Sequence, residues 1–323
     1  MTDSFGRTID YLRVSVTDRC DLRCRYCMPE SGICQLTHGE ILRYEEIVRI
    51  VRLLARLGIK KVRLTGGEPL VRKGLPILVR DIRNVEGIEK VCLTTNGTQL
   101  LENLPELVEA GLDGVNISLD ALTEDTFEKI TRRRGVERVL RSVESALSYP
   151  ELTVKINCVP SELNRDEIIP LARHFLKDER LSLRFIEMMP IGLGKEFAGI
   201  PEVELIRILE SEFGALSRLP DEIGGGPSRY FKLPGLPGRV GFISAVSHAF
   251  CLDCDRIRLT ANGFLKTCLQ YEIGTQLKPL LGLSDDELIE VLRHTILSKP
   301  EKHCFAEKNG AGLEQHIMSQ IGG

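Results

Sequence analysis

The sequence predicts an α/β fold built on a parallel sheet. Over the first two thirds of the 323 residues, short runs rich in β-branched residues alternate with stretches whose apolar residues recur at helical spacing. Apolar residues make up 42% of the chain and charged residues 28%, so disorder along the whole length is excluded. Alternating strands and helices imply parallel strands joined by right-handed crossovers. From these residues alone, the sheet is either doubly wound and open, or a full or partial barrel.

The helix over residues 44–57 shows the pattern most clearly. Ile47, Ile50, Val51 and Leu54 fall on one face, and Gly58 follows as the breaker. No GxGxxG turn follows the first strand, which weakens a dinucleotide-binding interpretation. Six strands are expected at 11–16, 61–64, 90–94, 115–119, 152–159 and 182–187. The helices between them are expected at 44–57, 75–84, 102–110, 123–131, 136–147 and 167–176.

The amino-acid composition of the chain changes after Pro190. Residues 190–201 are rich in Gly and Pro, and three consecutive glycines follow within 223–228. We therefore predict two domains, 1–200 and 201–323. The second part is expected to contain helices at 203–213 and 285–297 and short strands at 229–233, 239–243 and 256–260.

Charge and hydropathy exclude several classes of protein. The net charge of −3 gives no global basic field, so nucleic acid is not an expected partner. No apolar run approaches the ~18–20 residues that span a bilayer, and the N-terminus lacks a signal-peptide pattern. We expect a cytoplasmic protein without a membrane partner. A homodimer is compatible with the sequence, but no feature requires one.

Three cysteines form a tight group after the first strand. Cys20, Cys24 and Cys27 have the spacing C-x3-C-x2-C. Three thiolates within eight residues suit an iron–sulfur cluster, in which a fourth iron stays open and reactive. Zinc is the alternative, because Cys34 or His38 could supply a fourth ligand.

A second group lies near the other end of the chain. Cys251, Cys254 and Cys268 have the spacing C-x2-C-x13-C, which lacks the second C-x2-C pair of a zinc ribbon. His248 or Cys304 could complete a zinc tetrahedron, but the first group favours iron–sulfur here too. The remaining cysteines are interpreted as small buried or incidental thiols: Cys34, Cys92, Cys158 and Cys304.

The first cysteine group resembles that of the radical S-adenosylmethionine superfamily. Tyr26 precedes the third cysteine, and the segment Thr65-Gly-Gly-Glu-Pro69 follows the second strand. The resemblance implies S-adenosylmethionine bound at the open iron and cleaved to a 5′-deoxyadenosyl radical. It also implies a partial (β/α)6 TIM-like barrel, with a smaller C-terminal α+β domain closing the open side.

The whole pattern resembles one family within that superfamily, the GTP 3′,8-cyclases. Both cysteine groups and the terminal Gly322-Gly323 occur together. The resemblance implies conversion of GTP to (8S)-3′,8-cyclo-7,8-dihydroguanosine 5′-triphosphate, the first step of molybdenum cofactor biosynthesis. It implies two 4Fe-4S clusters with three cysteine ligands each, a reductant protein as electron donor, and cyclic pyranopterin monophosphate synthase as the next enzyme.

Matching segments carry the family's site residues onto this sequence. The arginines at 256 and 258 alternate, so both point to one face of a strand and suit a triphosphate. The S-adenosylmethionine contacts are Tyr26, Gly67, Ser118 and Met189. The GTP contacts are Arg13, Arg63, Thr94, Lys155, Arg184, Arg256, Ile257 and Arg258. The catalytic tail is Gly322 and Gly323, implied to assist radical initiation.

The positions of these residues along the strands predict where the site lies. Arg63, Thr94, Ser118, Lys155 and Met189 are expected at or just beyond the carboxyl ends of strands, and Arg13 in mid-strand. Parallel α/β folds carry their active sites at that edge.

Two alternatives stay open at this point. One is a radical S-adenosylmethionine enzyme that modifies a peptide, although such enzymes usually have more C-terminal cysteines. The other is a zinc-binding module without catalytic function.

Overall fold

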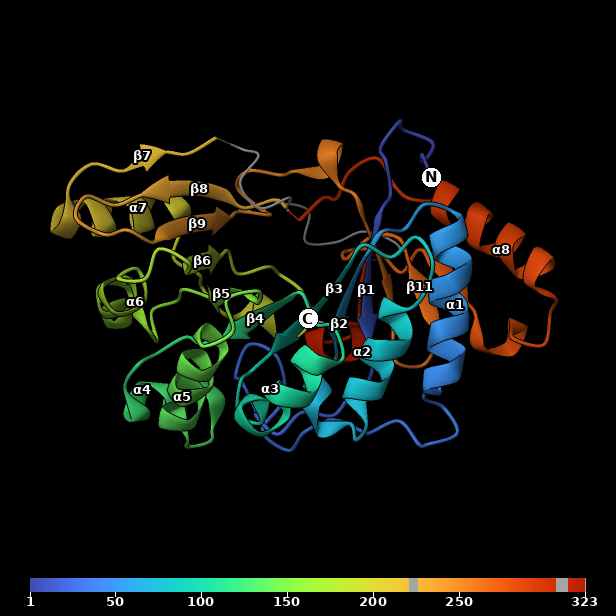
Figure 1. Ribbon diagram of the computed structural model, residues 1–323. Helices are drawn as coiled ribbons and strands as arrows, with labels where there is room; N and C mark the ends of the chain where they lie inside the picture. The colour runs from blue at the N-terminus through green and yellow to red at the C-terminus, as the bar shows by residue number, and fades with distance from the viewer. Residues whose placement is uncertain (221–225, 306–312, 323) are drawn as a thin grey trace.

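One continuous sheet organises the molecule (Figure 1). The computed structural model describes residues 1–220, 226–305 and 313–322. Within those ranges, twelve strands form the order β12-β11-β10-β1-β2-β3-β4-β5-β6-β9-β8-β7. The strands are β1 Tyr11–Ser15, β2 Lys61–Thr65, β3 Lys90–Thr95, β4 Gly114–Ser118, β5 Thr153–Cys158, β6 Ser182–Ile186, β7 Ser217–Arg218, β8 Arg229–Lys232, β9 Arg239–Ile243, β10 Arg256–Leu259, β11 Phe264–Lys266 and β12 Gly274–Gln276.

The central strands β1 to β6 are the six that the sequence predicts, and they pair in parallel. Two strands from the later part of the chain continue this arrangement, since β10 pairs parallel with β1 and β9 pairs parallel with β6. Antiparallel strands then complete each side. The sheet is open in the part of the chain that the structure describes, because β12 and β7 stand at its two ends.

Helices cover the outer face of this sheet (Figure 1). These helices are α1 Tyr44–Arg56, α2 Leu75–Arg83, α3 Leu100–Glu109, α4 Glu124–Thr131, α5 Val136–Leu147, α6 Ile168–Phe175, α7 Glu202–Phe213 and α8 Asp285–Leu297. A further short helix, α9 Met318–Ile321, is not part of this outer layer. None of the helices within the described ranges has both the length and the apolar composition needed to cross a bilayer.

Alternation along each strand separates an apolar layer from a polar one. Leu12 and Val14 of β1 are fully buried in the core cluster beneath the helices, while Arg13 between them points to the other face. The same holds in β10, where Ile257 and Leu259 belong to the core and Arg258 lines the inner cavity. The fold therefore places the charged side chains of these strands on the inner, concave face.

The C-terminal segment lies on that inner face. The end of the chain, drawn red in Figure 1, overlaps the central strands in this view. Met318 and Ser319 of this segment line the cavity on the inner face. A small second core of Ile191, Ala245, Phe305 and Ile321 buries α9. The division into domains 1–200 and 201–323 stays a prediction, although strands from the second range extend both sides of the sheet.

Candidate active site

One cavity on the inner face brings the predicted residues together. It is bordered by strands β1 to β6, by the loop after β1 and by the second cysteine group. Among the predicted residues, its lining includes Arg13, Cys20, Cys24, Tyr26, Cys27, Arg63, Gly67, Thr94, Ser118, Lys155, Arg184, Met189, Cys251, Cys254, Arg256, Arg258 and Cys268. The Ile257 side chain is instead fully buried in the core. Gly322 is buried beside Ser15 and Thr65, and Gly323 lies outside the described residues.

The cationic side chains sit deeper than the strand edge. Arg13 is the register partner of Arg258 on one side and of Arg63 on the other. The expectation that Arg63 and Lys155 stand at the carboxyl ends of their strands is wrong, because β2 continues to Thr65 and β5 to Cys158. Arg63 and Lys155 therefore lie in the middle of their strands. Thr94 and Ser118 lie nearer the carboxyl ends of β3 and β4.

Burial and neighbouring positive charge disfavour the charged form of three cations in this cavity. Burial, together with Arg184 and Arg63, lowers the pKa of the Lys155 ammonium to about 8. Burial together with Arg256 lowers the pKa of Arg258 to about 10. Burial and Arg258 also lower the pKa of Arg13 well below its usual value. Concentrated positive charge of this kind is stabilised by a polyanion.

Neutral partners hold two of these arginines. Arg63 donates from Nε to the Tyr11 hydroxyl and from Nη1 to the Leu93 carbonyl at 2.9 Å. Arg184 donates from Nε to Asn157 Oδ1 at 3.0 Å. These partners fix the direction of the guanidinium groups without neutralising them. The Thr94 hydroxyl is also buried at the cavity and has no hydrogen-bond partner among the described residues. Oriented guanidinium groups and an unpaired buried hydroxyl indicate a binding site for a polar ligand.

The first cysteine group lies in the loop that leaves β1. Burial raises the pKa of the Cys27 thiol to about 11, opposed by a hydrogen bond from the Ser319 backbone. Burial also raises the pKa values of Cys20 and Cys24, and the neighbouring thiols add to this. Thiols in this setting become thiolates only when a metal centre compensates their charge.

The spacing of the thiols argues for a centre larger than one ion. Sulfur ligands about 2.3 Å from a single zinc would lie roughly 4 Å apart. Yet across the described ranges, the group of metal-binding side chains whose ligand atoms all lie within 4.8 Å of one another is Glu272, Glu314 and His316. Neither cysteine group meets that limit, and the residues present therefore fit a cluster better than zinc.

Two glycines allow the segment that follows β2, here called the β2 exit loop, to pack closely against the loop after β1 that contains the first cysteine group, here called the cysteine loop. A Cβ atom on Gly67 would lie 2.3 Å from the Arg19 carbonyl oxygen, and one on Gly66 would lie 2.6 Å from that of Thr17. The Gly67 amide donates to the Thr17 carbonyl at 2.8 Å, and the Glu68 amide to that of Arg19 at 2.7 Å. This close approach sets the position of the cysteine loop.

Two buried carboxylates support the site and were not singled out from the sequence. Burial raises the pKa of Glu68 to about 7, although Glu68 accepts from the Asn96 amide at 2.6 Å. Burial raises the pKa of Asp120 to about 6, and Asp120 accepts from the Tyr26 hydroxyl at 2.6 Å. The sequence could have indicated both residues, because Glu68 belongs to the segment Thr65–Pro69 and Asp120 lies two residues after Ser118.

The second cysteine group borders the same cavity. The backbone amide of His303 donates to Cys251 Sγ at 3.4 Å, and Arg7 donates to the Cys251 carbonyl at 2.9 Å. The guanidinium of Arg256 lies 5.7 Å from the Tyr11 ring centroid and 5.6 Å from that of Phe250. Two cysteine groups therefore face one cationic space.

Comparison with known proteins agrees with this arrangement. Residues 14–174 match the model of the radical SAM superfamily, and residues 181–305 match the model named Molybdenum Cofactor Synthesis C. A GTP 3′,8-cyclase of Clostridium perfringens is 45% identical over 326 residues and one of Petrotoga mobilis 43% over 325, each covering 100% of both chains. Among solved structures, Streptococcus suis SuiB bound to its precursor peptide SuiA gives a TM-score of 0.60 at 16% identity, covering 94% of this chain and 74% of that one.

The fold and the two cysteine groups define an enzyme of the radical S-adenosylmethionine superfamily. Full-length identity then places the chain in a particular family: it belongs to the GTP 3′,8-cyclases. The predicted family, fold class, enzyme class and cofactors are confirmed. A zinc-binding module without catalytic function is excluded, and the likeness to SuiB concerns the fold alone.

Proposed function

We propose that this chain converts GTP to (8S)-3′,8-cyclo-7,8-dihydroguanosine 5′-triphosphate, the entry reaction of molybdenum cofactor biosynthesis. The observation that carries the proposal is the single cavity in which two three-cysteine groups face a set of buried cations. When bound there, S-adenosylmethionine and the clusters supply one-electron chemistry that removes a hydrogen atom from substrate. The chain's own residues bind, orient and enclose the reactants.

The first cysteine group and the residues near it would bind one cluster and S-adenosylmethionine, which together are the source of the radical. Cys20, Cys24 and Cys27 would ligate one cluster, leaving an iron open. Tyr26, fixed by its hydrogen bond to Asp120, would orient S-adenosylmethionine. The remaining contacts would come from Gly67, Ser118 and Met189, which line the same cavity.

The second group would hold the nucleotide. Arg13, Arg63 and Arg258 occupy neighbouring register positions on three adjacent strands, which suits the run of charges in a triphosphate. Lys155 and Arg184 extend this surface, and the buried Thr94 hydroxyl adds a polar contact. Arg256 would act with them, and Ile257 through its backbone. Cys251, Cys254 and Cys268 would ligate the cluster that meets the guanine base.

The C-terminal glycines would complete the site. Arg258 donates from Nη1 to the Gly322 carbonyl at 2.5 Å, so a proposed substrate contact and the proposed catalytic tail already meet. We include Gly323 in this assignment from the sequence. A reductant protein, the next pathway synthase and a homodimer remain part of the proposal, as does a cytoplasmic location.

Anaerobic reconstitution tests this function. About eight irons per chain are expected from two clusters. With S-adenosylmethionine, a reductant and GTP deuterated at C3′, the deuterium should appear in 5′-deoxyadenosine. The cyclised product should then have the mass of unlabelled GTP, because one electron from the reductant and one solvent proton replace the deuterium atom that was removed. A Cys251→Ser variant should keep about four irons and lose the cyclised product. One zinc per chain without iron, or full iron content without deuterium transfer, would refute the proposal.

A further inference from the structure

The tail of the chain, residues 313–322, reaches the cavity from one fixed starting point. Ser319 and Ile321 of its last turn, α9, are buried, and Gly322 has a left-handed backbone with φ of +79°. A Cβ atom on Gly322 would lie 2.9 Å from both Ser15 Cβ and Thr65 Oγ1. The end of the tail is thus closely fitted, and any shift at its start would displace it.

A buried ion pair holds that start. The Lys266 ammonium contacts the Glu314 carboxylate, and their side chains are 1% and 3% exposed. Lys266 also donates to the Tyr271 carbonyl, and the Glu314 amide donates to the Gln270 carbonyl at 2.6 Å. The pair therefore joins the tail to β11 and to the turn that follows it.

Strand register links this pair to the far end of the tail. Lys266 of β11 is the register partner of Arg258 of β10. Arg258 is the residue that donates to the Gly322 carbonyl. Two neighbouring positions of one strand pair therefore hold both ends of the tail, Glu314 through Lys266 and Gly322 through Arg258.

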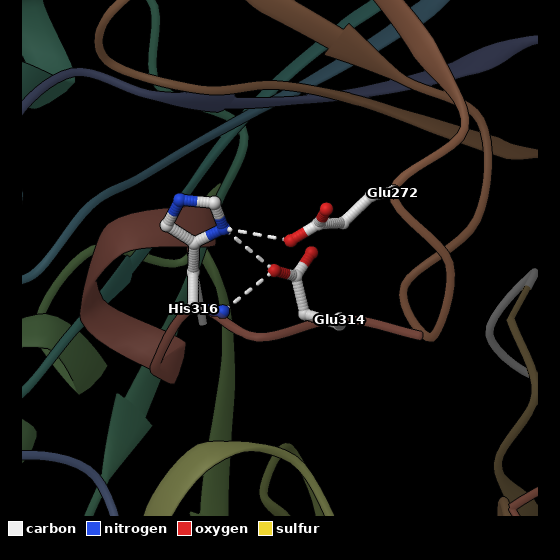
Figure 2. Close-up of side chains that lie close together, drawn as sticks. All are labelled: Glu272, Glu314 and His316. Carbon is white, nitrogen blue, oxygen red and sulfur yellow. Dashed lines mark hydrogen bonds and ion pairs between the residues drawn. The ribbon is translucent and has the colours of Figure 1, made fainter. Parts of the chain in front are cut away.

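Figure 2 shows a second, outer contact at the same place. His316 Nδ1 lies 2.8 Å from Glu314 Oε1 and 3.4 Å from Glu272 Oε1, and the His316 amide donates to Glu314 Oε1. These three residues resemble a metal-binding group, but Lys266 already compensates the charge of Glu314. We interpret the group as a clamp on the tail rather than a cation site.

We propose that Lys266 and Glu314 are positioning residues that set the reach of the tail, so that Gly322 meets Arg258 at the cavity. Their effect on turnover rests on the proposed function, but their effect on the tail does not. A buried ion pair is strongly disturbed when one partner is removed, because the other is left without compensation. Loosening the pair should therefore free the tail before it affects the sheet.

Hydrogen–deuterium exchange of the reconstituted full-length protein measures this directly. In Glu314→Gln, we expect the amides of 317–322 to exchange at least about tenfold faster, while those of β1 and β2 stay protected. Iron content should equal that of the unmodified protein. The kcat of cyclisation should fall about tenfold or more, with KM for GTP within about twofold, because the tail is proposed to act in the reaction and not in substrate binding.

Two further variants separate positioning from general destabilisation. Lys266→Met removes the other partner and should free the tail in the same way. Glu167→Gln alters another buried carboxylate, 4% exposed, which accepts from the Leu122 amide at 3.0 Å and has no described contact with the tail. It should leave tail exchange and the kcat-to-KM pattern unchanged.

The outcomes are distinguishable. Unchanged tail exchange in both Glu314→Gln and Lys266→Met would overturn the positioning proposal. Equal loosening of tail and sheet in Glu314→Gln, or a matching effect of Glu167→Gln, would also overturn it, because the pair would then act on general stability. If the variants show faster tail exchange but the unmodified protein does not cyclise GTP, the positioning role of Lys266 and Glu314 would be supported and the proposed function refuted.

Discussion

Lys155 shows how an acidic chain presents a local cationic site. It lies in mid-strand on β5, and its neighbours in the cavity include Arg63 and Arg184. Burial lowers the pKa of Lys155 to about 8, and repulsion by Arg184 and Arg63 acts in the same direction when no anion is bound. A bound triphosphate would reverse that balance and keep the lysine protonated. The repulsion is therefore relieved by substrate rather than by the protein.

Removing the Lys155 charge should weaken GTP binding. Because a hydrogen bond to a charged group contributes about 1.5–3 kcal/mol, we expect Lys155→Met to raise the Kd for GTP by roughly 10- to 100-fold. Equilibrium dialysis with reconstituted protein measures this. Lys155→Arg keeps the charge and should bind within a few-fold of the unmodified protein. Equal affinity in all three proteins would show that Lys155 does not contact the substrate.

The same lysine should make GTP binding depend on pH. Free Lys155 is protonated below about pH 8 and neutral above it, whereas the complex needs the protonated form. Affinity should therefore fall as pH rises above about 8, by at most tenfold per unit, since one proton is taken up on binding. Lys155→Arg should remove this slope between about pH 7.5 and 9. A slope that persists in the arginine variant would assign it to another group.

The β2 exit loop shows how two elements build a cofactor site together. Gly66 and Gly67 have room for no side chain, because the backbone of the cysteine loop occupies that space. Glu68 then accepts from the Thr95 hydroxyl at 2.7 Å and ties the loop to the end of β3. Contacts between β2, β3 and the loop after β1 therefore fix the positions of the three cysteines in that loop.

Gly67→Ala should therefore disturb the first cluster. The added methyl group would meet the Arg19 carbonyl oxygen at 2.3 Å and carbon at 2.7 Å, which are backbone atoms that cannot turn aside. We expect iron content to fall from about eight to about four per chain, with 5′-deoxyadenosine formation lost. Gly282→Ala is the matched control, because its Cβ atom would meet nothing within 4 Å. Full iron content in Gly67→Ala would contradict this account of the loop.

Elements of this kind differ in how far the sequence determines them. Strands β1 to β6 and the long helices were predicted, because buried apolar residues recur in a clear period along each of them. The strands β7, β11 and β12 have only two or three residues, too few to show a period.

Contacts between distant segments set the remaining limit on prediction from sequence. The partners Tyr26–Asp120 and Lys266–Glu314 are separated by 94 and 48 residues, and neither residue type alone indicates its partner. The depth of Arg63 and Lys155 depends on strand register, which a single sequence does not reveal.

At the scale of the whole molecule, the later part of the chain protects the sheet that the earlier part builds. β10 covers one side of β1, and β9 covers one side of β6. Helix α8 packs beside α1, where Arg49 donates to the Asp285 carboxylate at 2.8 Å. The cavity likewise includes residues of both parts, since the cations predicted to contact GTP lie on β1, β2, β5, β6 and β10.

A fragment of residues 1–200 should therefore not behave as an independent folded domain. Its strands β1 and β6 would become open edges, and strand edges without protection pair with other chains. We expect the fragment to aggregate, or to stay unfolded at low concentration, in light scattering and circular dichroism. Co-expression with residues 201–323 should restore a soluble complex, because the second fragment supplies β9 and β10. A monomeric 1–200 fragment that unfolds cooperatively on its own would instead establish the predicted domain as a separate folding unit.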